Sequence, residues 1–242
     1  MKAFVLSLGI LTIVYGKVVS AEDLGNIREI AGDYYSGDGL GVNCSLMVSS
    51  QGKFSFQWDG CLGNYDKNKG SARVINGILY ITPTKLNPHD GFRGTSTRFY
   101  PVPWGSRIYL IPTNEIVEFC SDINQGTEPR NDIHGSYYLR RGDEVKPVVG
   151  KPAIPGDWTK YLLEKPVCGR ITSLIGKQEA WLNKGSTDGL LEGMILTAQQ
   201  HGQTMFAQVQ VEVVETNSCR IKCCWQSSTV ETGQIVSSRF IP

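Results

Sequence analysis

The feature that most limits the fold of this chain is a repeated two-residue alternation of apolar and polar side chains. Between positions 205 and 213 an apolar residue stands at every second position, and between positions 54 and 58 three aromatic residues alternate with polar ones. A period of two places successive side chains on opposite faces of a β-strand. The chain is therefore expected to consist mainly of strands that bury one face each.

Turn signals divide the first half of the chain into short strands. Asn76-Gly77 stands between two apolar runs and favours a tight hairpin, because both residues tolerate positive φ. Further strands are expected at 98–102, 107–111 and 137–139. Short strands with Gly-rich turns are typical of an antiparallel meander, closed as a barrel or folded as a sandwich.

One helix is expected between 115 and 124, where apolar residues form a broad stripe. Thr113 or Asn114 is the expected N-cap, and Gly126 is expected to end the helix. Cys120 lies on the apolar stripe and is expected in the core.

Proline and glycine mark a division of the chain after the predicted closing strand. Three prolines between 147 and 155 favour extended backbone, and a short helical turn is expected at 157–163. A second series of predicted strands starts at Cys168. We therefore expect a signal peptide at 1–21, an N-terminal β domain at 22–146, a Pro/Gly-rich linker at 147–166 and a smaller C-terminal β-barrel at 167–242.

The first 21 residues match a secretory signal peptide. Lys2 precedes an apolar stretch from Ala3 to Gly16, and small residues end at Ala21 before the acidic Glu22. Lys17 interrupts a stretch that is already shorter than the ~20 residues of a membrane-spanning helix. The sequence thus predicts a periplasmic or secreted protein that does not span the membrane after cleavage.

The numbers of basic and acidic residues limit the classes of partner that the protein can bind. Lys and Arg total 24 against 23 for Asp and Glu. Nucleic-acid binding depends largely on a strongly basic surface, so no nucleic-acid partner is expected.

Seven cysteines in an exported chain predict disulfides, with one thiol left over. Cys44 and Cys61 flank one predicted turn. If the two strands pair so that the numbers of facing residues sum to 103, Cys44 faces Asp59. Cys61 is then a diagonal neighbour of Cys44 on the same face. A small change of register would allow a bridge between them. Cys168 is the expected partner of a late cysteine such as Cys219, because barrel closure brings the first and last strands together.

Metal and catalytic signatures are not evident. Cys219, Cys223, Cys224 and His201 could be gathered around a metal, but there is no Cys-x2-Cys knuckle, and we expect neither metal nor cofactor. Nucleophile elbows, zinc-protease helices, phosphate-binding loops and dinucleotide fingerprints are also missing from the sequence.

The segment 85–107 is the candidate binding surface. Cationic and aromatic side chains are interleaved there with little acidic charge, in and beside a long predicted loop. Such residues can hold an anionic or sugar ligand by charge and stacking. The alternative is that the rings face the core and the arginines face water. The candidate ligand-binding residues are Arg93, Arg98, Tyr100, Trp104 and Arg107.

Two resemblances add to this interpretation. Trp181-Leu182-Asn183-Lys184-Gly185, with Gly193-Met194 and Gly233-Gln234-Ile235-Val236, resembles a small β-barrel module of bacterial envelope scaffolds, as in the MreC family and flagellar assembly protein T. That resemblance implies a role in assembly without catalysis. Gly32-Asp33-Tyr34 and Gly60-Cys61-Leu62-Gly63 are similar to lipocalin-like domains of uncharacterised bacterial secreted proteins, which implies no known activity.

Taken together, these features predict a non-catalytic binding or assembly module of the bacterial cell envelope, stabilised by disulfides. Its partner would be an envelope protein or an anionic envelope component. Two alternatives stay open: a barrel that carries a small apolar ligand, or a hydrolase that uses His89 or His134. A carrier requires an open interior, an assembly module an exposed apolar patch, and an enzyme a histidine near a nucleophile or carboxylate.

Overall fold

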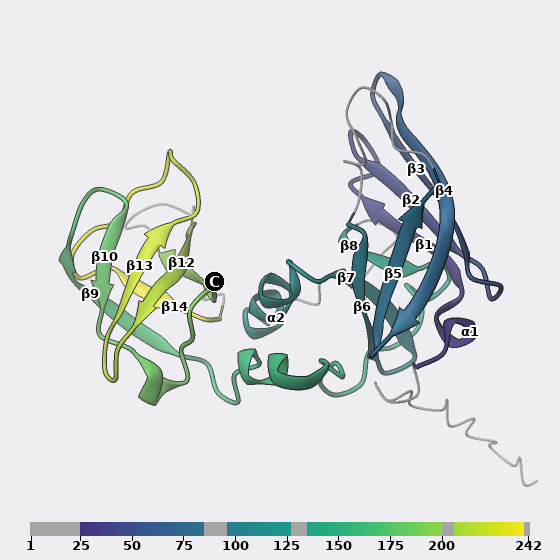
Figure 1. Cartoon of the computed structure of the whole chain (residues 1–242). Coiled ribbons are helices and arrows are strands. Elements are labelled where there is room, and N and C mark those ends of the chain that lie inside the picture. The colour runs from purple at the N-terminus through teal and green to yellow at the C-terminus, as the bar shows by residue number, and fades with distance from the viewer. Residues whose placement is uncertain (1–24, 85–95, 127–134, 200–205, 240–242) are drawn as a thin grey trace, which may run out of the picture.

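A computed structural model describes residues 25–84, 96–126, 135–199 and 206–239 of the chain. The predicted signal peptide, Arg93 and all three histidines lie outside these ranges. The described strands form two closed antiparallel barrels, an eight-stranded one followed by a six-stranded one (Figure 1). The expected mainly β fold, with a smaller C-terminal barrel, is confirmed.

The first barrel is an up-and-down meander in which each strand pairs with the next and β8 pairs with β1. Its strands are β1 (Gly32–Gly37), β2 (Asn43–Val48), β3 (Lys53–Gly60), β4 (Gly63–Ile75), β5 (Ile78–Pro83), β6 (Arg98–Trp104), β7 (Arg107–Pro112) and β8 (Gly135–Arg140). A short helix, α1 (Ile27–Ile30), precedes it. Asn76 and Gly77 join β4 to β5 with φ of 50° and 74°, as the Asn-Gly signal predicts.

The second barrel closes when its last strand pairs with its first, β14 with β9. Its strands are β9 (Cys168–Leu174), β10 (Glu179–Leu182), β11 (Ile195–Gln199), β12 (Phe206–Val214), β13 (Cys219–Cys223) and β14 (Ile235–Ser237). A 3-10 turn, η3 (Ser186–Asp188), lies between β10 and β11.

Alternating side chains fill the interior of each barrel. Phe54 and Phe56 of β3 are 2% and 1% exposed, and Leu46, Leu79 and Phe99 pack with them in one core cluster. In the second barrel Val209 and Val211 face a similar core.

Helix α2 (Ile116–Asn124) covers part of the outside of the first barrel and lies between the two barrels (Figure 1). Its N-cap is Glu115, whose side chain makes no capping hydrogen bond, so the expected caps Thr113 and Asn114 were wrong. Gly126 follows the helix with a φ of 81°, and Cys120 is fully buried as expected.

The segment between the barrels packs against the first barrel. Ile154 is 5% exposed, and a 3-10 helix, η2 (Gly156–Tyr161), forms close to the expected helical turn. Asn124 of α2 donates to the Tyr161 carbonyl at 2.8 Å and accepts from the Leu163 amide at 2.9 Å. Together, α2 and this segment cover the outer side of β6, β7 and β8, where a third core cluster forms.

Candidate functional site

The predicted arginine and aromatic site at 93–107 is not assembled among the described residues. Arg98 is exposed at the start of β6, whereas Arg107 starts β7 and pairs with Trp104. The six residue steps from Arg98 to Trp104 span about 20 Å of strand, so the two arginines lie at opposite ends of the hairpin.

Tyr100, Trp104 and Arg107 instead hold the connecting segment against the first barrel. The Tyr100 hydroxyl accepts from Trp158 Nε1 at 3.0 Å, and Trp104 Nε1 donates to the Gly150 carbonyl at 2.8 Å. Arg107 is 5% exposed and donates to the Glu144 carbonyl at 3.0 Å. Arg107 therefore faces neither an anionic ligand nor water, and the interactions of these three side chains are structural.

The disulfide bonds predicted from the sequence are not found either. All seven cysteines lie in described ranges, and no two of them are joined by a disulfide bond. Cys44 faces Trp58, because β2 and β3 pair with residue numbers that sum to 102 and not to 103. Cys44 points into the barrel, whereas Cys61 lies exposed beyond the end of β3, so the expected Cys44–Cys61 bridge is not formed.

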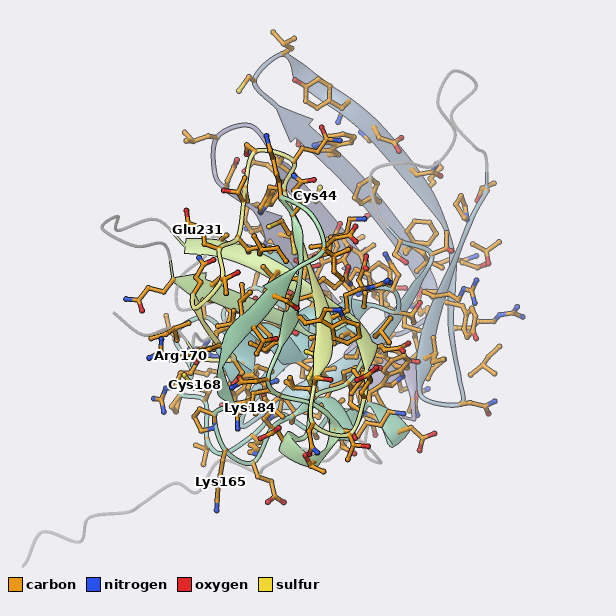
Figure 2. The ribbon with its side chains drawn as sticks, turned by 90° about the vertical axis from the view of Figure 1, so that its left-hand side faces the viewer. Cys44, Lys165, Cys168, Arg170, Lys184 and Glu231 are labelled. Carbon is orange, nitrogen blue, oxygen red and sulfur yellow. The ribbon has the colours of Figure 1, made fainter. Side chains whose placement is uncertain are left out.

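The expected bridge from Cys168 to a late cysteine is not formed either. The first and last strands of the second barrel do pair, as expected, but Cys168 then faces Ser237 of β14. Cys219 lies on β13, with β10 between it and β9, and its side chain is buried while that of Cys168 is exposed. Cys44 lies on β2 of the first barrel and Cys168 on β9 of the second; both are labelled in Figure 2. The adjacent Cys223 and Cys224 differ in burial, since the first is buried and the second exposed.

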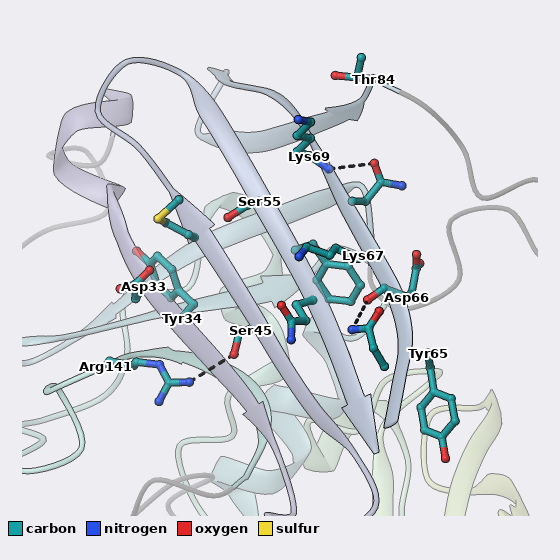
Figure 3. Close-up of a pocket in the computed structure, with 15 residues that line it drawn as sticks. Asp33, Tyr34, Ser45, Ser55, Tyr65, Asp66, Lys67, Lys69, Thr84 and Arg141 are labelled. Carbon is teal, nitrogen blue, oxygen red and sulfur yellow. Dashed lines mark hydrogen bonds between the residues drawn. The ribbon is translucent and has the colours of Figure 1, made fainter. Parts of the chain in front are cut away.

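The surface that α2 leaves uncovered carries the best candidate site. A hollow of about 960 Å³ lies along β1 to β4 and is shown in Figure 3. Most of its lining side chains alternate with buried residues along their strands, so they face outward. They are Asp33, Ser45, Met47, Ser55, Gln57, Lys67, Lys69 and, after β8, Arg141.

Positive charge dominates this outer face. Lys67 and Lys69 are exposed on β4, and Arg141 donates to Ser45 Oγ at 3.2 Å and lies 4.9 Å from the centre of the Tyr35 ring. Asp33 supplies the exposed negative charge, and Met47, which is 48% exposed, supplies an apolar contact. The face can therefore hold an anionic group, because three cations surround a hollow with one exposed carboxylate.

Buried Asp66 directly precedes Lys67 on β4 and also belongs to the lining of the hollow. It is 5% exposed, and neither of its carboxylate oxygens has a hydrogen-bond partner among the described residues. Its cross-strand neighbour Trp58 also buries Nε1, which has no hydrogen-bond partner in the described part of the chain. A buried carboxylate without a partner costs stability. Sequence reasoning missed this face because β4 from 63 to 72 is polar and shows no alternation of apolar residues.

The described residues also bear on metals and membranes. They contain no group of three or more His, Cys, Asp or Glu side chains that could hold a metal ion. They also include no helix of sufficient length and apolar character to cross a bilayer. Comparisons of the chain with protein-family models, with curated proteins and with solved structures find no match.

Proposed function

We propose that this protein is an exported, non-catalytic binding module of the bacterial cell envelope, and that the outer face of β1 to β4 holds an anionic envelope component. The observation that carries the proposal is the hollow lined by Lys67, Lys69 and Arg141. These cations come from β4 and from the turn after β8, and the barrel brings them to one surface. Charge complementarity then favours an anionic partner.

The predicted signal peptide and the resemblance to envelope scaffolds support a location in the cell envelope. Residues 1–21 have the pattern of a signal peptide, and the C-terminal barrel has the glycine and apolar spacing of an assembly module. Hydrolysis through His89 or His134 stays a separate prediction, because both histidines lie outside the described residues.

The experiment compares two triple variants of the full chain. Lys67→Gln, Lys69→Gln and Arg141→Gln remove the three cations of the hollow. Arg28→Gln, Lys165→Gln and Lys177→Gln remove the same number of exposed cations elsewhere. Binding to washed bacterial envelopes is measured by co-sedimentation over a range of salt concentrations.

We expect the hollow variant to bind at least several-fold more weakly and with a shallower salt dependence than the wild type, while the control variant binds normally. Equal losses in the two triple variants would mean that only overall charge matters and would overturn the proposal. Export is checked separately by the mass of the mature protein, which should begin at Glu22.

A further inference from the structure

Two hairpin tips at one end of the first barrel expose apolar side chains. In the β1–β2 connection Leu40 is 79% and Val42 44% exposed. In the β3–β4 hairpin Leu62 is 90% and Tyr65 41% exposed. We call these four residues the tip patch. Single exposed apolar residues are common, but a group of four on adjoining loops is typical of an interaction surface.

The two tips lie against each other. Cys61 Sγ is 3.6 Å from the Leu40 carbonyl oxygen. The chains approach so closely that a Cβ atom at Gly60 would lie 2.6 Å from the Gly41 carbonyl oxygen. The tip patch is therefore one surface formed by two hairpins.

Hydrogen bonds hold the first tip in shape. Asp38 Oδ1 accepts from the backbone amides of Leu40, Gly41 and Val42 at 2.8, 2.9 and 3.0 Å. These backbone hydrogen bonds lower the pKa of Asp38. Because the loop is already ordered, exposing Leu40 to a partner requires little further loss of conformational entropy.

A row of outward side chains follows the tips on the face that carries the hollow. Arg141 bonds to Ser45, Ser45 faces Gln57 on β3, and Gln57 faces Lys67 on β4. Lys67 is four residues from Gly63 at the tip, which corresponds to roughly 13 Å of strand. This separation is about equal to the depth at which apolar groups enter a bilayer interface plus one Debye length. With the tips inserted, the cations would therefore still be close enough to attract the negative headgroups.

We propose that the tip patch inserts into an anionic lipid bilayer, with Lys67 and Arg141 above the lipid headgroups. This inference rests on the proposed function and names the anionic component as a membrane surface. Two protruding tips fit a deformable bilayer, and the cations behind them complement its negative headgroups. The carboxylates near the tips are engaged by neighbours: Asp38 by the loop amides, and Asp59 by Gln57 at 2.8 Å and Asn64 at 3.1 Å.

The test measures binding of the full chain to vesicles of phosphatidylcholine with or without phosphatidylglycerol, by co-sedimentation. The test variant is Leu40→Ser with Leu62→Ser. The matched control is Leu174→Ser with Ile175→Ser, because these residues are 46% and 52% exposed on the second barrel. Thermal unfolding of both variants verifies that they fold.

We expect the tip variant to lower the partition coefficient for anionic vesicles about tenfold or more, and the control to leave it unchanged. Wild-type binding should weaken strongly on vesicles without phosphatidylglycerol. Normal vesicle binding by the folded tip variant would overturn the inference.

A soluble polyanion, poly-glutamate, separates this inference from the function on which it rests. If the wild type binds poly-glutamate through Lys67, Lys69 and Arg141 but does not bind vesicles, the proposed function holds and insertion is wrong. Vesicle binding could instead need Leu40 and Leu62 but be insensitive to the three cations and to phosphatidylglycerol. That result would overturn both the proposed anionic partner and the claim that the tip patch selects an anionic bilayer.

Discussion

The backbone amide of Ile195 in β11 donates a hydrogen bond of 3.0 Å to Ser121 Oγ in α2. The same hydroxyl donates to the Val117 carbonyl at 2.9 Å, and Ser121 is 1% exposed. One buried hydroxyl thus joins the helix of the first barrel to a strand of the second. The contact gives the two barrels a specific attachment.

Ser121→Ala should weaken this attachment. The substitution leaves the partly buried Ile195 amide without its acceptor, so we expect a loss of about 1 kcal/mol in the free energy of unfolding. Urea denaturation measures the loss, and Ser227→Ala, at an exposed position, is the control. A loss in Ser227→Ala as large as that in Ser121→Ala would show that the shared hydroxyl contributes nothing specific.

Asp66→Asn should stabilise the protein. Both carboxylate oxygens of Asp66 are buried and have no hydrogen-bond partner within the described ranges, and an amide of the same shape is less costly to bury than a charge. We expect a higher Tm, equivalent to about 1 kcal/mol or more. Asp59→Asn is the control, because Asp59 accepts hydrogen bonds and should gain nothing. A lower Tm for Asp66→Asn would show that the carboxylate has a stabilising partner.

Asp122 should make stability depend on pH. Burial raises its pKa, although the hydrogen bond from the Tyr137 hydroxyl, at 2.8 Å, opposes this effect. The folded state therefore binds the proton more tightly than the unfolded state, in which the pKa is near 4. Asp122 therefore contributes its full share of stability below about pH 4, and this share is lost as the pH rises through the pKa of Asp122 in the folded state.

The measurement is the free energy of unfolding of Asp122→Asn and wild type across this range. The variant keeps an acceptor for Tyr137 and cannot ionise, so its stability relative to wild type should increase as pH rises. A difference between the two proteins that stays constant with pH would contradict the raised pKa.

The cysteines should differ in reactivity toward iodoacetamide. Burial raises the pKa of Cys44 to about 11 and of Cys120 and Cys219 to about 12, which suppresses the reactive thiolate. Cys61 and Cys168 are exposed. Cys224 is exposed as well, but burial of its thiol and the neighbouring Cys223 raise its pKa. We expect peptide mass spectrometry of the native protein at pH 8 to find Cys61 and Cys168 modified first. Modification of Cys44 as fast as Cys61 would contradict the inward position of Cys44.

Elements with a clear local signal were predictable from the sequence. The alternation at 54–58, the Asn76-Gly77 turn and the apolar stripe of α2 all correspond to observed elements. The register of β2 with β3 differed from the prediction by one residue, which moved Cys44 from Asp59 to Trp58. Register depends on how both strands meet the rest of the barrel, and a turn sequence alone does not specify it.

The candidate site was predicted less well, for a related reason. Arginine and aromatic residues at 98–107 looked available for a ligand, but α2 and the connecting segment occupy that outer surface, as the bond between Trp158 and Tyr100 shows. The basic face of β1 to β4 combines Lys67 with Arg141, which are distant in sequence. No local pattern connects two such residues.

By itself, the amino-acid sequence determined those strands that alternate clearly, the turns with strong Gly and Asn signals, and that two β regions follow each other. Those properties depend on side chains within a few positions, through periodicity and backbone preference. Only the tertiary structure decided which outer face of the first barrel is covered, because each strand of a closed barrel has an outer side that any other segment can cover. Packing of α2 on β6 to β8 left β1 to β4 exposed, and with them the cations and the tip patch.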